Sequence, residues 1–173
     1  MLAAGFSDPE VVRIWLGRDH PDVDEVIDER VRRYRAVVGD GSTVLPHVRE
    51  AVRYAASRVP VAIVSGAARA EIEPVVRAAG LEDVLATIVS SDDVVEGKPH
   101  PEGYLSALQL LGGDIRAADV LVFEDTEAGV AAAKAAGMRC FAVLGTLAPA
   151  RLASADEIVP VIDVPLMERV FGA

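Results

Sequence analysis

Cysteine is nearly absent from this chain of 173 residues, and its scarcity bears on both structure and location. The single cysteine, Cys140, lies in the apolar run Cys140–Leu144, so no internal disulfide can form. A chain without internal disulfides suits a reducing cytoplasm, which is where we expect this protein. Within an apolar run a cysteine behaves as a small hydrophobic residue, so we expect an inert thiol.

Long hydrophobic runs and an excess of positive charge are also missing. No run approaches the roughly 20 apolar residues of a membrane-spanning helix. Residues 1–7 carry neither a basic region nor an apolar core, so we expect no signal peptide. The net charge of −10 argues against nucleic acid and anionic membranes as main partners. A small phosphorylated metabolite remains possible, because local cations and a metal ion could hold it.

The pattern of the sequence changes near residue 40. Residues 1–41 are typical of charge-rich helices, one beginning at Pro9 and one spanning Asp22–Val38, and residues 39–42 form the best candidate boundary. Beyond it, helical and apolar segments alternate. We predict helices over Pro46–Arg58, Arg69–Ala79, Pro101–Leu111 and Thr126–Ala136, and strands over Val59–Val64, Leu85–Val89, Val120–Phe123, Arg139–Leu144 and Ile158–Ile162. Such alternation predicts an α/β fold with a parallel sheet flanked by helices. Pro74 should kink or restart its helix.

Two adjacent carboxylates, Glu124 and Asp125, follow the predicted strand Val120–Phe123, and Thr126 can cap the next helix. In parallel sheets, ligands lie outside the carboxyl ends of the strands. Adjacent carboxylates repel each other unless water, hydrogen bonds or a cation offsets the repulsion. All-oxygen sites that keep several waters suit Mg²⁺. Spacing alone supports equally the alternative that both acids merely favour the positive end of the helix.

Two further loops carry candidate binding residues. Ser65 follows a predicted strand, and its hydroxyl, with the backbone N–H groups of Gly66 and Ala67, could hold a phosphoryl oxygen. The alternative is an ordinary helix cap. Lys98 lies in a loop stiffened by Pro99 and Pro101, and it is one of only two lysines in the chain. A lysine in a rigid loop hints at a point-charge role, although a lone lysine is usually a surface residue.

In this order, the three loops resemble the haloacid dehalogenase superfamily, closest to its β-phosphoglucomutase-like and phosphoglycolate-phosphatase-like branch. The matching segments are Ile-Val-Ser-Gly at 63–66, Gly-Lys-Pro-His-Pro at 97–101, Phe-Glu-Asp-Thr-Glu-Ala-Gly-Val at 123–130 and Ala-Ala-Lys-Ala-Ala-Gly-Met at 132–138. The resemblance covers residues 42–144. It implies a Rossmann-like core in residues 42–173 and part of an α-helical cap in residues 1–41.

The resemblance also implies an activity, namely Mg²⁺-dependent phosphoryl transfer by a phosphatase or phosphomutase acting on a small phosphorylated metabolite. Ser65, with Gly66 and Ala67, would bind the transferring phosphoryl group, and Lys98 would neutralise it. Asp125, assisted by Glu124, would hold Mg²⁺.

The sequence departs from this family at the nucleophile. The family begins with a strand and an Asp-x-Asp-Gly-Thr-type loop, whose first aspartate is the nucleophile and whose second is the acid/base. The only Asp-x-Asp here, Asp22-Val23-Asp24, has no apolar strand before it and no Gly-Thr after it, so we interpret it as a helix start. We therefore expect a chain that lacks its N-terminal nucleophile segment. The alternative is an inactive short form that acts as a phosphate- or Mg²⁺-binding module or as an interaction module.

By resemblance, the strand that carries the nucleophile lies between the strands ending at Ser65 and Phe123. Without it, unpaired backbone groups would be exposed on both neighbours, and self-association through these edges becomes possible. An aspartyl-phosphate mechanism also needs a carboxylate in line with phosphorus. We therefore expect no more than trace phosphatase activity from this chain alone.

Overall fold

The computed structural model describes residues 8–38, 43–145 and 147–172. Its α-helices are α1 (Asp8–Leu16), α2 (Val23–Val38), α3 (Pro46–Ala56), α4 (Arg69–Ala78), α5 (Glu102–Leu111), α6 (Glu127–Ala135) and α7 (Val164–Phe171). Its strands are β1 (Ala62–Val64), β2 (Thr87–Val89), β3 (Leu121–Glu124), β4 (Arg139–Val143) and β5 (Glu157–Val159). The predicted α/β class is confirmed.

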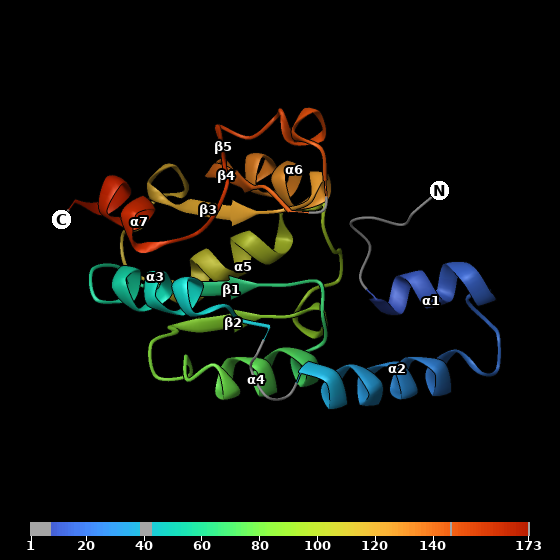
Figure 1. Cartoon of the computed structure of the whole chain (residues 1–173). Coiled ribbons are helices and arrows are strands. Elements are labelled where there is room, and N and C mark those ends of the chain that lie inside the picture. Colours follow the sequence, from blue (N-terminus) through green and yellow to red (C-terminus); the bar gives the residue numbers. More distant parts are fainter. Residues whose placement is uncertain (1–7, 39–42, 146, 173) are drawn as a thin grey trace.

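The strands form two parallel sheets. β1 pairs with β2, with Ile63 opposite Ile88. The second sheet has the order β3-β4-β5, with Phe123 opposite Phe141. Within the described ranges, no ladder joins β1 to β3, although Figure 1 shows both strands running in the same direction through the body of the protein. Each sheet therefore ends on a strand, β1 or β3, that is paired on one side only.

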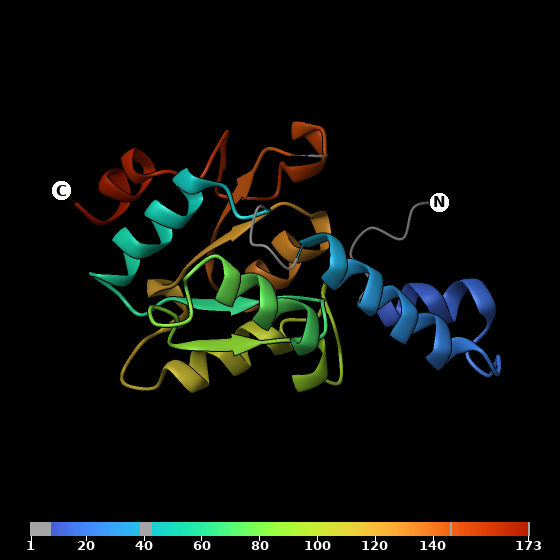
Figure 2. The same ribbon diagram turned by 60° about the horizontal axis from the view of Figure 1, so that its bottom comes forward.

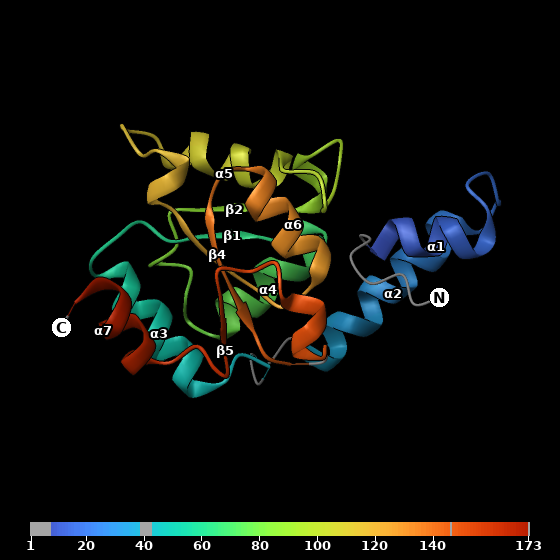
Figure 3. The same cartoon turned by 90° about the horizontal axis from the view of Figure 1, so that it is seen from above.

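Helices cover both faces of the sheets, as the view from above in Figure 3 shows. Successive side chains of a strand point to opposite faces. Accordingly Cys140 and Ala142 of β4 join a core cluster with Val130 of α6, whereas Phe141 packs in a second cluster with Leu166 of α7. Helix α5 contacts β1 and β2, and α6 contacts β3 and β4.

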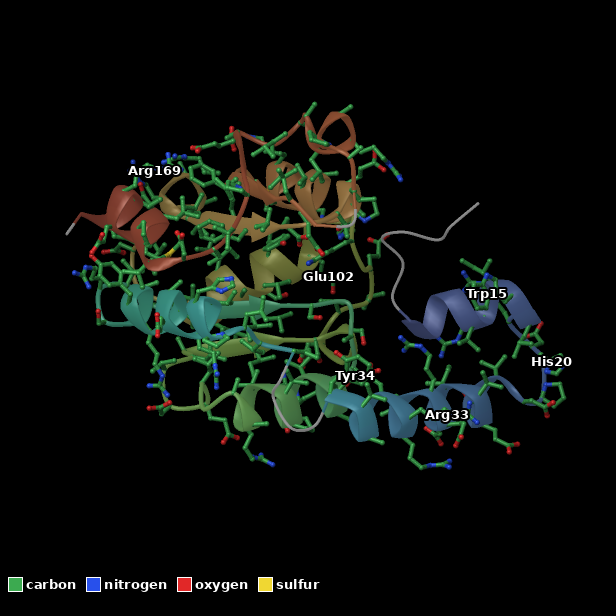
Figure 4. All side chains as sticks on the ribbon, viewed as in Figure 1. Trp15, His20, Arg33, Tyr34, Glu102 and Arg169 are labelled. Carbon is green, nitrogen blue, oxygen red and sulfur yellow. The ribbon has the colours of Figure 1, made fainter. Side chains whose placement is uncertain are left out.

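Helices α1 and α2 form a hairpin that projects from the body on the side where the strands end (Figures 1 and 2). We call it the helical arm. Val12 and Val23 are buried, and α2 contacts α4. Arg30 pairs with the buried Glu71 of α4 across this junction, at 3.4 Å. Figure 4 shows Trp15 on the outer face of α1, where 76% of its surface is exposed.

Several predicted boundaries differ from the structure. Only the last three residues of the predicted strand Val59–Val64 are a strand, because the N–H of Val59 donates to Ala55 at the end of α3. The strand predicted over Ile158–Ile162 ends at Val159, before Pro160, which cannot donate to a ladder. Helix α4 continues past Pro74 without restarting. The predicted boundary at 39–42 lies outside the described residues.

One helix, α7, had not been predicted. The Asp163 side chain caps it by accepting a hydrogen bond from the N–H of Leu166 at 2.9 Å. Among the described helices, none combines the length and apolar character needed to cross a bilayer.

Candidate functional site

Lys98 connects the ends of the two sheets. Its Nζ donates to the carbonyl oxygen of Val64, the last residue of β1, at 3.0 Å. The same ammonium forms an ion pair with Glu124, the last residue of β3. Ser65 and Asp125 are the next residues along each chain segment, so the structure brings all three sequence-predicted loops to one edge of the molecule.

The turn after β1 leaves few donors for an anion. The N–H of Ala67 donates to Ser65 Oγ at 3.1 Å, so the Ser65 hydroxyl hydrogen can still be donated. The N–H of Ala68 donates to the Glu71 carboxylate, and the N–H of Arg69 donates to the Asp92 carboxylate. The start of α4 is thus already capped by carboxylates of the protein.

Three donors remain at this turn among the described residues. They are the Ser65 hydroxyl, the N–H of Gly66, for which no described group is an acceptor, and the third N–H of Lys98. Of the predicted phosphate-binding residues, Ala67 has no N–H available for a phosphate, because its N–H donates to Ser65 Oγ. A phosphoryl group accepts charge-assisted hydrogen bonds strongly, so these donors suit it.

Glu124 is buried, with 7% of its surface exposed, and both carboxylate oxygens accept hydrogen bonds. Oε1 accepts hydrogen bonds from the Lys98 ammonium and the Tyr104 hydroxyl. Oε2 accepts hydrogen bonds from the N–H of Asp125 at 3.3 Å and from the hydroxyl of Thr126 at 3.4 Å. Burial, followed by the negative charge of Glu124, raises the pKa of Tyr104 well above its usual range. Tyr104 therefore stays protonated and serves as a donor to Glu124.

The helix after β3 is shaped around this carboxylate. As predicted, Thr126 caps α6, and its hydroxyl oxygen accepts a hydrogen bond from the N–H of Gly129 at 3.0 Å. A Cβ at Gly129 would overlap the carboxylate of Glu124. Nearby, burial and then the charge of Glu124 raise the pKa of the Cys140 thiol to about 12. That thiol stays protonated, which agrees with an inert core cysteine.

The two adjacent acids differ in their availability to a metal ion. Asp125 is exposed, and its carboxylate has no partner among the described residues, whereas every oxygen of Glu124 is engaged. Mg²⁺ is commonly bound through one or two carboxylates while it keeps several waters. The residues fit such an ion with Asp125 as a direct ligand and Glu124 holding the backbone of Asp125 in place.

A cavity of about 420 Å³ lies between the helical arm and the strand ends. From the core, Ser65, Gly66 and Lys98 line it, and from the arm, Arg13 and Arg18 line it. Glu124 and Asp125 are absent from its lining, so Lys98 is the residue shared by the cavity and the acidic pair.

Acidic and neutral polar side chains also line the cavity, and all but one of them have a hydrogen-bond or ion-pair partner among the described residues. The Asp92 carboxylate accepts the N–H of Arg69, and Glu96 contacts His100 Nε2 at 3.2 Å. The exception is Ser91, whose buried hydroxyl has no hydrogen-bond partner among the described residues. A buried hydroxyl normally has a partner, and a ligand or water in the cavity could provide one.

Sequence reasoning missed Tyr104 and the two arginines. Tyr104 could have been found, because the first turn of a helix that begins at Glu102 lies directly after the Lys98 loop. Arg13 and Arg18 carry no local signal, because their position over the cavity depends on the packing of α2 against α4.

Comparison with known proteins agrees with this geometry. Residues 9–137 match the haloacid dehalogenase-like hydrolase family. A validoxylamine A 7'-phosphate phosphatase from Streptomyces hygroscopicus subsp. limoneus is 35% identical over 124 residues, which cover 72% of this chain and 55% of that protein. A phosphoglycolate phosphatase from Yersinia pestis is 30% identical over 132 residues, covering 73% of this chain and 55% of that protein.

Among solved structures, CbbY from Rhodobacter sphaeroides in complex with phosphate superposes with a TM-score of 0.76 at 22% identity, covering 93% of this chain and 75% of that one. This likeness supports the predicted Rossmann-like fold. The chain spans about half the length of the curated relatives it matches. The family match over residues 9–137 identifies the chain as a member of the haloacid dehalogenase-like hydrolases, with neighbours in the CbbY, phosphoglycolate phosphatase and β-phosphoglucomutase branches.

Proposed function

We propose that the chain is the core and part of the cap of a Mg²⁺-dependent phosphoryl-transfer hydrolase, a phosphatase or phosphomutase that acts on a small phosphorylated metabolite. The observation that carries this proposal is the Lys98 ammonium, which joins the end of β1 to Glu124 beside the free donors of Ser65 and Gly66. Relatives named as phosphatases of phosphorylated metabolites add support.

In this proposal each residue has a distinct task. The Ser65 hydroxyl, the Gly66 N–H and the Lys98 ammonium bind the oxygens of the transferring phosphoryl group. Asp125 holds Mg²⁺, which supplies charge stabilisation to that group, and Glu124 keeps Lys98 and Asp125 in position. Preorganised positive charge of this kind is the main source of catalysis in phosphoryl transfer.

The remaining requirement is a nucleophile. We propose that a strand paired between β1 and β3 supplies it, because within the described part of the chain these two strands are each paired on one side only, and Lys98 keeps their ends close. A carboxylate at the end of such a strand would lie beside Lys98 and Asp125. Without it, charge stabilisation remains but the covalent step is lost, so we propose no more than trace activity for residues 1–173 alone.

Release of phosphate from a panel of sugar phosphates and phosphoglycolate tests the proposal. The chain would be assayed with Mg²⁺, with and without an N-terminal extension that contains an apolar strand and Asp-x-Asp-Gly-Thr. We expect turnover only with the extension, and its loss in Lys98→Ala and Asp125→Ala. Arg49→Gln, which removes a charge outside the cavity, should remain active. Robust turnover by residues 1–173 without the extension, abolished by Asp125→Ala, would contradict the proposal.

A further inference from the structure

The helical arm exposes apolar side chains on the face of α2 that no other element covers. Val26, Tyr34 and Val37 are all exposed, and 76% of the surface of Val37 is accessible. They lie along a surface hollow of about 710 Å³ whose lining residues all come from Asp22 to Val37. We propose that this face docks on the same face of a second copy of the chain, with the two α2 helices antiparallel. The inference is independent of the proposed function.

The first argument is the spacing of the residues that line the hollow. They recur every three or four positions, which places them on one side of α2. We call this side the α2 stripe. Asp22, Glu25, Val26 and Glu29 form its first half, and residues 30, 33, 34 and 37 form its second half. A stripe with this spacing is what one helix of an antiparallel pair presents to the other.

The second argument is the order of charges along the stripe, and it identifies the partner. All the acidic side chains belong to the first half, whereas Arg30 and Arg33 belong to the second half. A partner of uniform charge would be attracted by one half and repelled by the other. A second α2 that runs antiparallel presents its arginines to the acids and its acids to the arginines, so the stripe is complementary to itself.

The third argument is that a two-fold axis between Glu29 and Arg30 gives each exposed group a neighbour. Val26 faces the second half of the other stripe, where four residues at this spacing form the hole that a facing side chain fills. Tyr34 in turn faces the first half. Among the described residues, neither the Glu25 carboxylate nor the Tyr34 hydroxyl has a partner. In the dimer, the Tyr34 hydroxyl of one copy donates to Glu25 of the other.

The shape of the molecule leaves room for this pairing. The arm projects from the body, and α2 runs from the tip of the arm toward the body (Figures 1 and 2). Antiparallel pairing therefore places each body beyond the tip of the other arm. Because α2 has 16 residues and is only about 24 Å long, the contact is small. We expect a weak dimer with a Kd of about 10–100 µM.

Sedimentation velocity of residues 1–173 at low salt, between about 5 and 500 µM, tests the proposal. We expect a monomer–dimer equilibrium that weakens about tenfold in Glu25→Arg and in Arg33→Glu, because by symmetry each substitution replaces two attractive contacts with repulsive ones. Asp28→Arg, which reverses an exposed acid of α2 outside the stripe, should leave the equilibrium unchanged.

Mixing the two charge variants gives the sharper test. One variant is basic at both positions and the other is acidic at both, so an antiparallel pair of one of each regains two attractive contacts. The mixture should dimerise within about twofold of the parent chain. Arg33 also pairs with Glu29 of its own helix at 2.6 Å, and recovery on mixing shows that the loss in Arg33→Glu arises between chains.

Three outcomes would overturn the proposal. The first is a chain that stays monomeric throughout this range, and the second is a dimer that both charge variants leave intact or that their mixture fails to restore. The third is a dimer lost when the N-terminal strand extension is added, because the contact then belongs to the edges of β1 and β3. Trp15→Ser should keep the dimer, since Trp15 lies on α1 outside the stripe.

Discussion

The two neighbouring acids at the end of β3 show how burial gives identical chemical groups different tasks. Glu124 is enclosed and accepts hydrogens from Lys98, Tyr104 and Thr126, whereas Asp125 faces solvent. Sequence reasoning located the pair because it follows an apolar strand. Spacing alone could not distinguish the two acids, because their burial depends on Tyr104 and Gly129, which come from two different helices. Only the family resemblance made Asp125 the expected Mg²⁺ ligand and Glu124 its assistant.

This difference predicts how the site responds to loss of the exposed acid. Asp125→Ala should abolish most Mg²⁺ binding, because Mg²⁺ requires oxygen ligands and the oxygens of Glu124 are engaged. Binding to residues 1–173 should be weak even in the parent chain, so calorimetry at millimolar Mg²⁺ is the suitable measurement. Asp114→Ala, which removes another exposed aspartate, is the control. Equal Mg²⁺ affinity in Asp125→Ala and the parent would refute the assignment.

Tyr104→Phe should destabilise the folded chain by about 1–3 kcal/mol, because a buried carboxylate loses one of its hydrogen-bond donors. Urea unfolding at pH 7 measures this. The pKa of Tyr104 is raised above its ordinary value by burial and then by Glu124. Its contribution is therefore complete below the unfolded-state pKa of about 10 and is lost as the pH rises beyond it. A difference between parent and variant that grows, rather than shrinks, above pH 10 would contradict this.

Gly129→Ala tests how tightly α6 is fitted to Glu124. Alanine is normally favoured over glycine inside a helix by about 1 kcal/mol, but here its Cβ would overlap the Glu124 carboxylate. We expect a net destabilisation of about 1–3 kcal/mol from overpacking, measured as a lower urea midpoint. Gly145→Ala is the matched control, since a Cβ there meets nothing within 4 Å. A Gly129→Ala chain that is more stable than the parent would show that the Glu124 carboxylate can shift to make room for the added Cβ.

At the scale of elements, the sequence could predict the order of strands and helices, and therefore which loops lie together at the carboxyl edge of the sheets. The apolar runs that predict strands and the Thr126 helix cap are local signals that the structure confirms. Helix α7 was missed because it is only eight residues long, although its Asp163 cap, Pro165 in the first turn and its amphipathic pattern are local signals that could have found it. Short strands such as β1 were overextended, because apolar residues also fill the turns beside them.

The loop that carries Lys98 gives an element-scale prediction. The Glu102 carboxylate, at the start of α5, accepts the N–H groups of Val95 at 2.8 Å and Glu96 at 2.9 Å. These two backbone hydrogen bonds are the main reason that the pKa of Glu102 lies below its usual value. Glu102→Ala should therefore speed amide hydrogen exchange at both residues and weaken phosphate binding, because Lys98 is held less firmly.

Glu127→Ala provides the comparison, because Glu127 also begins a helix but pairs with Arg151 rather than with a loop backbone. It should leave exchange at Val95 and Glu96 unchanged. If Glu102→Ala also leaves that exchange unchanged, other contacts hold the loop and the carboxylate is dispensable.

At the scale of the whole molecule, the relation between the two sheets governs activity. Sequence could indicate, by resemblance, where a strand belongs, but it could not reveal whether β1 and β3 would close the space by pairing with each other. Among the described residues they do not pair, and Lys98 spans their ends instead. Their unpaired edges can accept either a strand or a second copy of the chain.

Adding the strand should therefore raise stability and activity by separable routes. An extension with an apolar strand and Asp-x-Asp-Gly-Thr buries several side chains, each contributing about 1.5–3 kcal/mol, so the melting temperature should rise by several degrees. The same extension with asparagine in place of the first aspartate should give the same rise without phosphate release, because pairing needs the backbone and the reaction needs the carboxylate. Sedimentation would show whether the chain without the extension dimerises and whether the strand reverses this. A rise in activity with no change in melting temperature would mean that the strand does not pair between β1 and β3, and that the carboxylate reaches the site by another path.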